Sequence, residues 1–521
     1  MKRTVATAII GLLVMISAAL NLSFALRSGS LSRPPVYDDV VYLLDAYQRL
    51  AFGGVNSLRT LVNSFLTQPP HAPMSTLTAM LGYSLIGPYL WAAYAANVWM
   101  LGLFAAAVYL VARQNMDRIP SILVVALMLF VPAAHALITE FRPDQGAGVI
   151  LACALYSLVS TDYAKATRPR LVALGFLVVC AVMAKPSAIV ATVPVLGLAA
   201  AIGILRPGYY SSSEAIYSIR AAILAVAVAI AILIPCAVLW GPVTYAYIYQ
   251  ALVTNKDIWG ADGGQLYHWM FNSFGAGGHQ ALGPFLWLGL SSIMVDALLS
   301  FSAKPHRSNY DTLAFYFVTT ILYSGIAVSS QKTVYQGSLF YFPFLLATTL
   351  AVGRILMRIG GRAPIAITGV LLATAIIFMP ATSFYQFYPE FQDSAPILVS
   401  ISNDVADEVL RKRTSGCAAD RFVLAAMNPD PIPPEAVALD LAMRRRVKIA
   451  PLTPYTVRSA AEMDHAVDGA DFVILSRAGE LSNLPGSKFG AHTSLRLSTS
   501  ADWRRIAASG DYELFAKAKC R

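Results

Sequence analysis

Long apolar segments recur along the first three quarters of the chain, and they constrain its fold more than any other feature. Hydropathy predicts about eleven membrane-spanning helices, at residues 4–26, 80–111, 119–138, 146–160, 171–184, 188–205, 221–240, 282–300, 313–328, 339–352 and 365–379. The chain is 57% hydrophobic and only 13% charged, whereas soluble proteins carry roughly 25% charged residues. The sequence therefore predicts a mainly α-helical, polytopic membrane bundle.

The distribution of cations predicts how this bundle is oriented. Lys and Arg residues fall on alternate connections: Lys2/Arg3, Arg113/Arg118, Lys165/Arg168/Arg170, Arg206/Arg220, Lys304/Arg307 and Arg354/Arg358/Arg362. Cytoplasmic loops are enriched in such residues, so the net charge of +10 requires no nucleic-acid partner. We expect a multi-pass protein of the bacterial inner membrane, with the N-terminus in the cytoplasm and the C-terminus in the periplasm. Residues 4–26 exceed the roughly 7–15 residues of a signal-peptide core and are expected to be a retained helix.

The composition changes near residue 380, which predicts two domains: a transmembrane domain at 1–380 and an extracytoplasmic α/β domain at 381–521. Helical patterns alternate there with short apolar runs, and a Ser-Gly-Asp turn within 503–516 predicts a hairpin. No Gly-rich phosphate fingerprint follows a strand, so no nucleotide is expected. Cys417 and Cys520 both lie in this domain, where either a disulfide or two free thiols are compatible with the sequence.

Two adjacent carboxylates, Asp38 and Asp39, open an amphipathic helix after the first span. Its apolar residues recur at helical spacing from Val40 to Tyr47. Acids near the positive end of a helix are common, so helix capping is one interpretation. The other is an acidic site at the outer surface of the membrane.

Further polar groups collect on the same predicted face. They are Gln68-Pro69-Pro70-His71, Glu140-Phe141-Arg142-Pro143-Asp144, Lys185, and Gln331-Lys332 with Tyr335. A carboxylate can accept the proton of an acceptor hydroxyl, while Arg, Lys or His stabilises charge on a phosphate leaving group. The pattern therefore favours group transfer from an anionic lipid donor. A plain ion pair of Arg142 with Asp144, and lysines that snorkel to the interface, are the structural alternatives.

In order and on one side, these motifs resemble those of the GT-C superfamily of membrane glycosyltransferases, including the aminoarabinose transferases of lipid A and the protein mannosyltransferases. The Asp-Asp pair resembles their acidic motif in the first outer loop. Gln68-Pro69-Pro70-His71 resembles their Pro-Pro loop, Arg142-Pro143-Asp144 an Arg-Pro-Asp turn, and Lys185-Pro186 a Lys-Pro turn. Gln331-Lys332 resembles a late Lys-containing motif. Gln68 departs from the pattern, because the aminoarabinose transferases have a basic residue there.

The resemblance implies a bundle with an acidic site that uses polyprenyl-phosphate-linked sugars as donors. It implies that Asp38 is the general base and that Asp39 orients the acceptor or shares the proton, in a single displacement with inversion. Donor-phosphate and substrate contacts are expected from His71, Glu140, Arg142, Asp144, Lys185, Lys332 and Tyr335, with Gln68 at the Pro-Pro loop. No cofactor is expected, although paired acids could hold a divalent metal ion. The acceptor is not specified.

Two other function classes are compatible with parts of the pattern. A transporter or flippase of lipid-linked sugars would also need a cationic cavity, but it should show repeated halves and charges at mid-membrane. A noncatalytic scaffold could use the outer domain to bind a partner. The Gly- and aromatic-rich connection at 241–280 is either a mobile cover over the site or an interfacial loop with Trp and Tyr at headgroup level.

Overall fold

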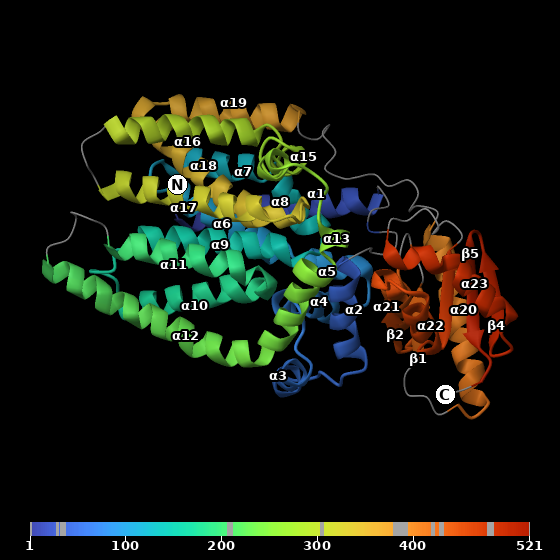
Figure 1. Cartoon of the computed structure of the whole chain (residues 1–521). Coiled ribbons are helices and arrows are strands. Elements are labelled where there is room, and N and C mark those ends of the chain that lie inside the picture. Colours follow the sequence, from blue (N-terminus) through green and yellow to red (C-terminus); the bar gives the residue numbers. More distant parts are fainter. Residues whose placement is uncertain are drawn as a thin grey trace.

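The computed structural model describes residues 3–27, 31, 38–205, 212–302, 307–378, 394–417, 422–426, 432–476 and 484–519. It consists of a bundle of long helices and a C-terminal α/β region (Figure 1). The bundle contains α1 (Arg3–Arg27), α5 (Leu90–Ala96), α6 (Val98–Ala112), α7 (Arg118–Met128), α8 (Pro132–Thr139), α9 (Pro143–Ser160), α10 (Arg168–Ala184), α11 (Ile189–Leu205), α12 (Ser212–Tyr249), α16 (Phe285–Ser302), α17 (Arg307–Val328), α18 (Ser338–Ile359) and α19 (Ala363–Phe378). The predicted mainly helical fold class is confirmed.

The number of spans agrees roughly with the prediction. Among the described residues, seven helical segments are long and apolar enough to cross a membrane, and the bent pair α7 and α8 would make an eighth. Helices α9, α10 and α19 occupy the other three predicted positions. The described spans therefore follow the hydropathy pattern, but several are short or broken.

Two predicted spans are interrupted in the structure. The apolar run at 80–111 is divided, because α4 (Pro73–Ile86) ends at Gly87 and a new helix begins at Leu90. Gly87 has a φ of 114°, which a residue with a side chain rarely adopts. The run at 119–138 is bent by 64° between α7 and α8, where Pro132 begins the second helix.

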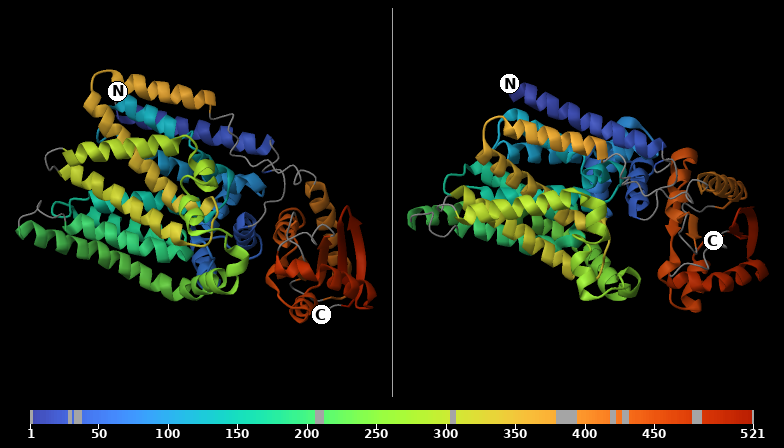
Figure 2. Two further views of the ribbon diagram at one scale, coloured as in Figure 1. Left: turned by 45° about the horizontal axis from the view of Figure 1, so that its top comes forward. Right: turned by 90° about the horizontal axis from the view of Figure 1, so that it is seen from above.

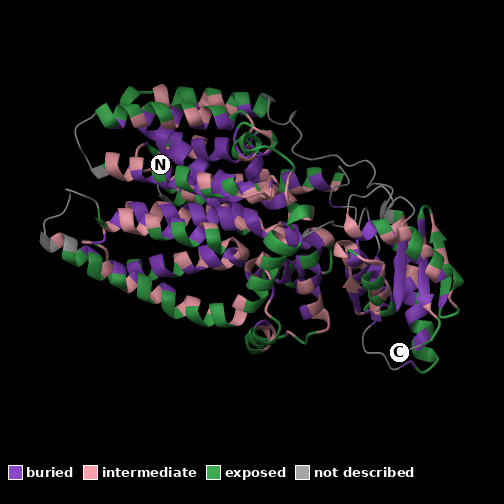
Figure 3. Ribbon diagram, viewed as in Figure 1, coloured by how far each residue is buried: buried purple, intermediate pink, exposed green. Residues whose placement is uncertain are grey.

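The centre of the bundle is α18, of whose apolar span 94% is buried. It packs on α9, α16 and α17. A close approach to α9 is allowed by Gly148, since a Cβ there would lie 2.1 Å from the carbonyl oxygen of Ser338. Figure 3 shows buried residues concentrated around these central helices. The first residues of α9 and α18 are thereby held near each other at one end of the bundle.

Short helices cover that end. They are α2 (Asp38–Ala51), α3 (Leu58–Thr67) and α4 from the first outer connection, and η2 (Gln250–Thr254), α13 (Lys256–Trp259), α14 (Gln265–Met270) and α15 (Ala276–Leu282) from the connection after α12. Figures 1 and 2 show the C-terminal region beside this end and the N-terminus at the opposite end. We call the end next to the C-terminal region the outer end.

The C-terminal region has a five-stranded sheet of order β2-β1-β3-β5-β4. Its elements are α20 (Ser394–Thr414), β1 (Phe422–Ala426), α21 (Pro434–Arg445), β2 (Ile449–Leu452), η5 (Pro454–Thr456), α22 (Ala460–Asp468), β3 (Phe472–Ser476), η7 (Pro485–Phe489), α23 (Gly490–Thr499), β4 (Trp503–Ser509) and β5 (Tyr512–Lys517). β1 pairs in parallel with β2 and β3, while β5 is antiparallel to β3 and β4. The β4–β5 pair is the predicted hairpin. The predicted domain boundary at 380/381 lies outside the described residues.

The two parts of the molecule share a hydrophobic core through α2. Val40 and Leu43 on α2 belong to the same buried cluster as Val437 and Leu439 on α21. In addition, the side-chain amide of Gln48 donates to the Ile449 carbonyl oxygen at 3.1 Å. Cys417 is disulfide-bonded, and Cys520, its predicted partner, lies outside the described residues.

Candidate active site

Asp39 is held at the beginning of α2 by two different parts of the bundle. Its Oδ2 accepts hydrogen bonds from the Tyr94 hydroxyl at 3.1 Å and from the Phe141 backbone N–H at 2.8 Å. Its Oδ1 lies 3.4 Å from Nε of Arg142. Asp39 is only 9% exposed, so these donors stabilise a carboxylate that is largely removed from water. Asp38 is the first residue of α2, and its side chain lies outside the described part of the structure.

Arg142 occupies an extended turn between α8 and α9. The turn is extended because Pro143 follows, and a residue before proline is driven out of the helical region. The guanidinium of Arg142 contacts Asp39 on one side and lies 4.0 Å from the ring centroid of Tyr335 on the other. A cation this close to a ring face is stabilised by the ring's quadrupole. Arg142 thus joins α2 to the connection between α17 and α18.

Glu140 precedes Arg142 in the same turn and is bonded to the start of α9. Its carboxyl group accepts a hydrogen bond from the side-chain amide of Gln145. Burial raises the pKa of Glu140, while the Arg142 guanidinium acts in the opposite direction. The turn therefore brings a second buried acid next to Arg142.

Asp144 and Lys185 form a second ion pair beside the first. Asp144 is in the first turn of α9 and is only 3% exposed. Nζ of Lys185 donates to Oδ1 of Asp144. Lys185 ends α10, and the backbone leaves the helical conformation there before Pro186. Arg142 pairs with Asp39 and Asp144 pairs with Lys185, so these two residues of the turn bind different partners.

Lys332 and Tyr335 lie on the connection at residues 329–337. Nζ of Lys332 donates to the backbone carbonyls of Ile326 and Ala327 at 3.1 and 3.0 Å. These carbonyls are in the last turn of α17, where a cation complements the helix dipole. Burial lowers the pKa of Lys332 to about 8. Tyr335 begins the short helix η3 (Tyr335–Gly337) and places its ring against Arg142.

The Gln68–His71 turn is tied to α2 and α12. The Gln68 carbonyl accepts from Nη2 of Arg49 at 2.6 Å, and its side chain is exposed. The indole N–H of Trp240 donates to the Pro70 carbonyl at 3.0 Å. The His71 ring contacts an aromatic ring on each of these helices. The ring centroids lie 6.2 Å from Tyr42 and 4.0 Å from Tyr247.

A small hollow lies beside Arg142. It is lined by residues of α4, by Asn97, Met100 and Leu137, by Arg142 with the first turn of α9, and by Ala184. The backbone N–H groups at the start of a helix attract anions, and an Arg side chain adds a full positive charge. The hollow therefore lies beside a cation and the start of a helix, next to a fixed carboxylate.

Comparison with known proteins supports this arrangement at the level of the fold. No protein-family model and no curated protein sequence matches the chain. The solved structure of ArnT from Cupriavidus metallidurans in the apo state is 13% identical, with a TM-score of 0.57, and the match covers 96% of this chain and 97% of that one. The same protein bound to undecaprenyl phosphate matches at 12% identity and a TM-score of 0.57, over 99% and 98% of the chains.

The chain has the fold of ArnT, a GT-C fold. The fold that the motif resemblance implies is thus confirmed over nearly the whole chain. The archaeal oligosaccharyltransferase AglB from Archaeoglobus fulgidus, in complex with an inhibitory peptide and a dolichol-phosphate, also matches, at 12% identity and a TM-score of 0.49, over 97% of this chain and 74% of that one.

Within this GT-C fold, Tyr94 is a site residue that the sequence reasoning missed. It lies on α5, buried among apolar residues, and its hydroxyl is directed at Asp39. A single Tyr within Leu-Trp-Ala-Ala-Tyr-Ala-Ala was the only signal, because a buried phenol normally finds a hydrogen-bond partner. Sequence alone does not tell which partner that is.

In the candidate site, hydrogen-bond donors surround Asp39. Both carboxylate oxygens of Asp39 face donors or a cation. Across the described residues, no group of three or more His, Cys, Asp or Glu side chains is placed to hold a metal ion.

Proposed function

We propose that this chain is an integral-membrane glycosyltransferase. It moves a sugar from a polyprenyl-phosphate donor to a glycan, lipid or protein acceptor at the outer face of the bacterial inner membrane. The observation that carries the proposal is the contact of Asp39, Arg142 and Tyr335. These residues come from three distant segments of the sequence, and the contact assembles an acid, a cation and an aromatic ring at one end of a GT-C bundle.

The donor side of the proposed site is cationic. Arg142 lines the hollow, and Lys185 and Lys332 lie on neighbouring connections. Positive groups held in place before the reaction stabilise the charge that develops on a phosphate leaving group. The likeness to ArnT bound to undecaprenyl phosphate supports a polyprenyl phosphate as the leaving group.

The acid side of the site divides its roles between two carboxylates. Asp39 already accepts two hydrogen bonds on one oxygen and faces Arg142 with the other, which suits a carboxylate that orients its neighbours. Asp38 is the proposed general base. It takes the proton of an acceptor hydroxyl while the hydroxyl oxygen bonds to the anomeric carbon of the sugar. In the same step, the bond between the anomeric carbon and the oxygen of the donor phosphate breaks. A single displacement of this kind inverts the anomeric configuration.

The orientation of the protein is part of the proposal. The basic connections at the end opposite the C-terminal region face the cytoplasm, as the positive-inside rule expects. The site and the α/β region then face the periplasm. We also propose that no metal ion is required, because the oxygens of Asp39 are directed at donors and at Arg142.

Turnover by purified protein in lipid nanodiscs tests the proposal. A series of defined polyprenyl-phosphate sugars is supplied with envelope extract as acceptor, and the released polyprenyl phosphate is measured. Wild type should release it, and Asp38→Asn should abolish release while the protein stays folded. Asp511→Asn, at the exposed hairpin turn of the C-terminal region, is the matched control and should keep normal turnover. Near-normal release by Asp38→Asn would contradict the role of Asp38 as general base. If wild type released no polyprenyl phosphate with any donor, the proposed function would be wrong.

A further inference from the structure

A short segment of the connection after α12 links the candidate site to the C-terminal region. We call residues 250–261 the strap. It begins as the π-helical turn η2 at the end of α12 and continues as the short helix α13. Single π-helical turns are rare in proteins. Many of those that do occur lie at functional sites. The strap is therefore a segment whose contacts are informative.

On one side, the strap is bonded to the connection that carries Lys332 and Tyr335. The side-chain amide of Gln331 donates to the Ala251 carbonyl at 3.2 Å, and the Ala261 N–H donates to the Ser330 carbonyl at 3.0 Å. Gln331 is itself oriented by the side-chain amide of Gln336, which donates to its Oε1 at 3.0 Å. Both ends of the strap thus contact the connection at 329–337.

On its other side, the strap is bonded to the C-terminal region. Nη2 of Arg458, just before α22, donates to the Thr254 carbonyl at 2.8 Å and to Oδ1 of Asp257 at 2.6 Å. The Trp259 and Tyr455 rings meet edge to face at 5.9 Å. The bond from Arg458 lowers the pKa of Asp257. Arg458 bridges a helix end and a carboxylate that are three residues apart.

We propose that the C-terminal α/β region positions the cationic side of the site through the strap, and that Arg458 is the positioning residue. The connection at 329–337 has little regular structure of its own, so its place depends on what it is bonded to. Arg458 holds the strap, the strap holds Gln331, and the same connection places Tyr335 against Arg142. The effect of Arg458 on donor binding rests on the proposed function.

The Arg458 contact acts on position and contributes little to global stability. The Arg458 and Asp257 side chains are 47% and 59% exposed, and exposed pairs contribute little to unfolding free energy. Loss of the contact should therefore open the strap locally while both parts of the molecule stay folded. Loss of a residue that only supported the fold would instead lower the global stability, without opening the strap in the molecules that stay folded.

Trypsin cleavage after Lys256 reports strap opening without any activity measurement. Lys256 is an exposed residue of α13. In Arg458→Gln, we expect cleavage at this bond to be roughly fivefold faster, because the strap opens more often. The control is Arg505→Gln, which removes the ion pair of the exposed Arg505 with Glu513 in the same region, away from the strap, and should leave the cleavage rate unchanged. Equal rates in wild type and Arg458→Gln would overturn the role of Arg458.

Binding of undecaprenyl phosphate in nanodiscs reports the effect on the site. Arg458→Gln should raise the Kd roughly fivefold, with the melting temperature unchanged. The exchanged pair Asp257→Arg with Arg458→Asp should restore the Kd. Faster cleavage with an unchanged Kd would overturn the coupling to the site. If wild type does not bind undecaprenyl phosphate, the donor assignment fails, and the trypsin comparison still decides whether Arg458 holds the strap.

Discussion

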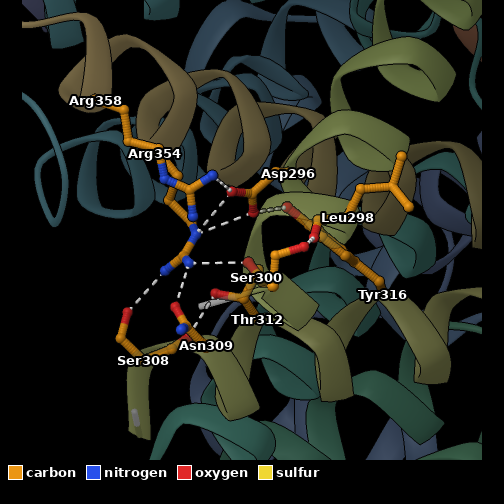
Figure 4. A network of polar contacts seen from close by, with 10 residues as sticks. Asp296, Leu298, Ser300, Ser308, Asn309, Thr312, Tyr316, Arg354 and Arg358 are labelled. Carbon is orange, nitrogen blue, oxygen red and sulfur yellow. Dashed lines mark hydrogen bonds and ion pairs between the residues drawn. The ribbon is translucent and has the colours of Figure 1, made fainter. Parts of the chain in front are cut away.

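Two buried charge clusters lie at opposite ends of the bundle, and they differ in how fully their groups are engaged by protein. The outer cluster joins Asp39 and Arg142. The inner one joins Asp296 on α16 to Arg354 near the end of α18 (Figure 4). The outer cluster lies beside the start of α18, and Arg354 of the inner cluster lies near its end. At about 1.5 Å per residue along α18, the two clusters are separated by roughly 25 Å.

The inner cluster satisfies its groups internally. Asp296 is fully buried, and its carboxylate accepts from Nε of Arg354 at 2.9 Å and from the Tyr316 hydroxyl at 3.0 Å. The remaining nitrogens of Arg354 donate to the side chains of Ser308, Ser300 and Asn309 at 2.9, 3.1 and 2.6 Å. Figure 4 shows these side chains converging on one guanidinium. A network of this kind holds α16, α17 and α18 together.

The outer cluster presents its cation to a hollow. Arg142 lies 3.4 Å from Asp39, has one face against Tyr335, and also lines the hollow at the start of α9. The difference shows that a buried charge in a membrane bundle is not by itself a site. A transporter of lipid-linked sugars would need charges at mid-membrane, whereas the inner charges lie near one end of the bundle and hold helices together. Three substitution experiments test this contrast.

The largest effect is expected from Asp296→Asn. It leaves the Arg354 guanidinium buried without its carboxylate, which costs about 3–5 kcal/mol. Denaturant or thermal unfolding should show this loss, while turnover per folded molecule stays the same. The double variant Asp296→Leu with Arg354→Leu should recover much of the stability, because an apolar pair leaves no isolated charge. A folded Asp296→Asn protein without turnover would place this cluster in the catalytic machinery.

The next largest effect is expected from Arg142→Gln. Removing a preorganised positive group from a phosphate leaving group costs about 10²–10³-fold in turnover. The loss in stability should be smaller, because the Asp39 carboxylate keeps its bonds from Tyr94 and Phe141. Arg142→Lys is the matched variant. This variant keeps the charge without the planar contact to Tyr335, so its turnover should lie between that of wild type and that of Arg142→Gln. If Arg142→Gln kept wild-type turnover, the outer cluster would have no more role in turnover than the inner one.

The smallest effect is a pH dependence of donor affinity. Since burial lowers the pKa of Lys332 to about 8, its ammonium is charged at pH 7 and loses its proton as the pH rises through 8. Donor affinity should therefore fall several-fold between about pH 7 and pH 9. In Lys332→Arg the charge persists over this range, and the affinity should become nearly independent of pH. An unchanged pH profile in Lys332→Arg would remove Lys332 from donor binding.

Much of the fold was readable from the sequence because membrane insertion depends on local properties. Apolar length predicts where helices lie, and the described helices follow it from α1 to α19. The polar turns at Arg142, Lys185 and Lys332 stood out because charges are scarce in such a chain. The bend between α7 and α8 was not predicted. There, Pro132 begins a new helix within one apolar run.

The pairing of these groups required the tertiary structure. Which carboxylate meets Arg142, and that Tyr94 and Tyr335 meet the same cluster, depends on how α2, α5, α9 and α18 pack. The link from Arg458 through the strap to Gln331 uses bonds between residues 204 and 80 positions apart in the sequence. The sequence by itself therefore determined the helices and the scarcity of their charges, because hydropathy and local charge are properties of each segment. Only the tertiary structure decided which charges form a site and which hold helices together, because that depends on the directions of side chains from several packed helices.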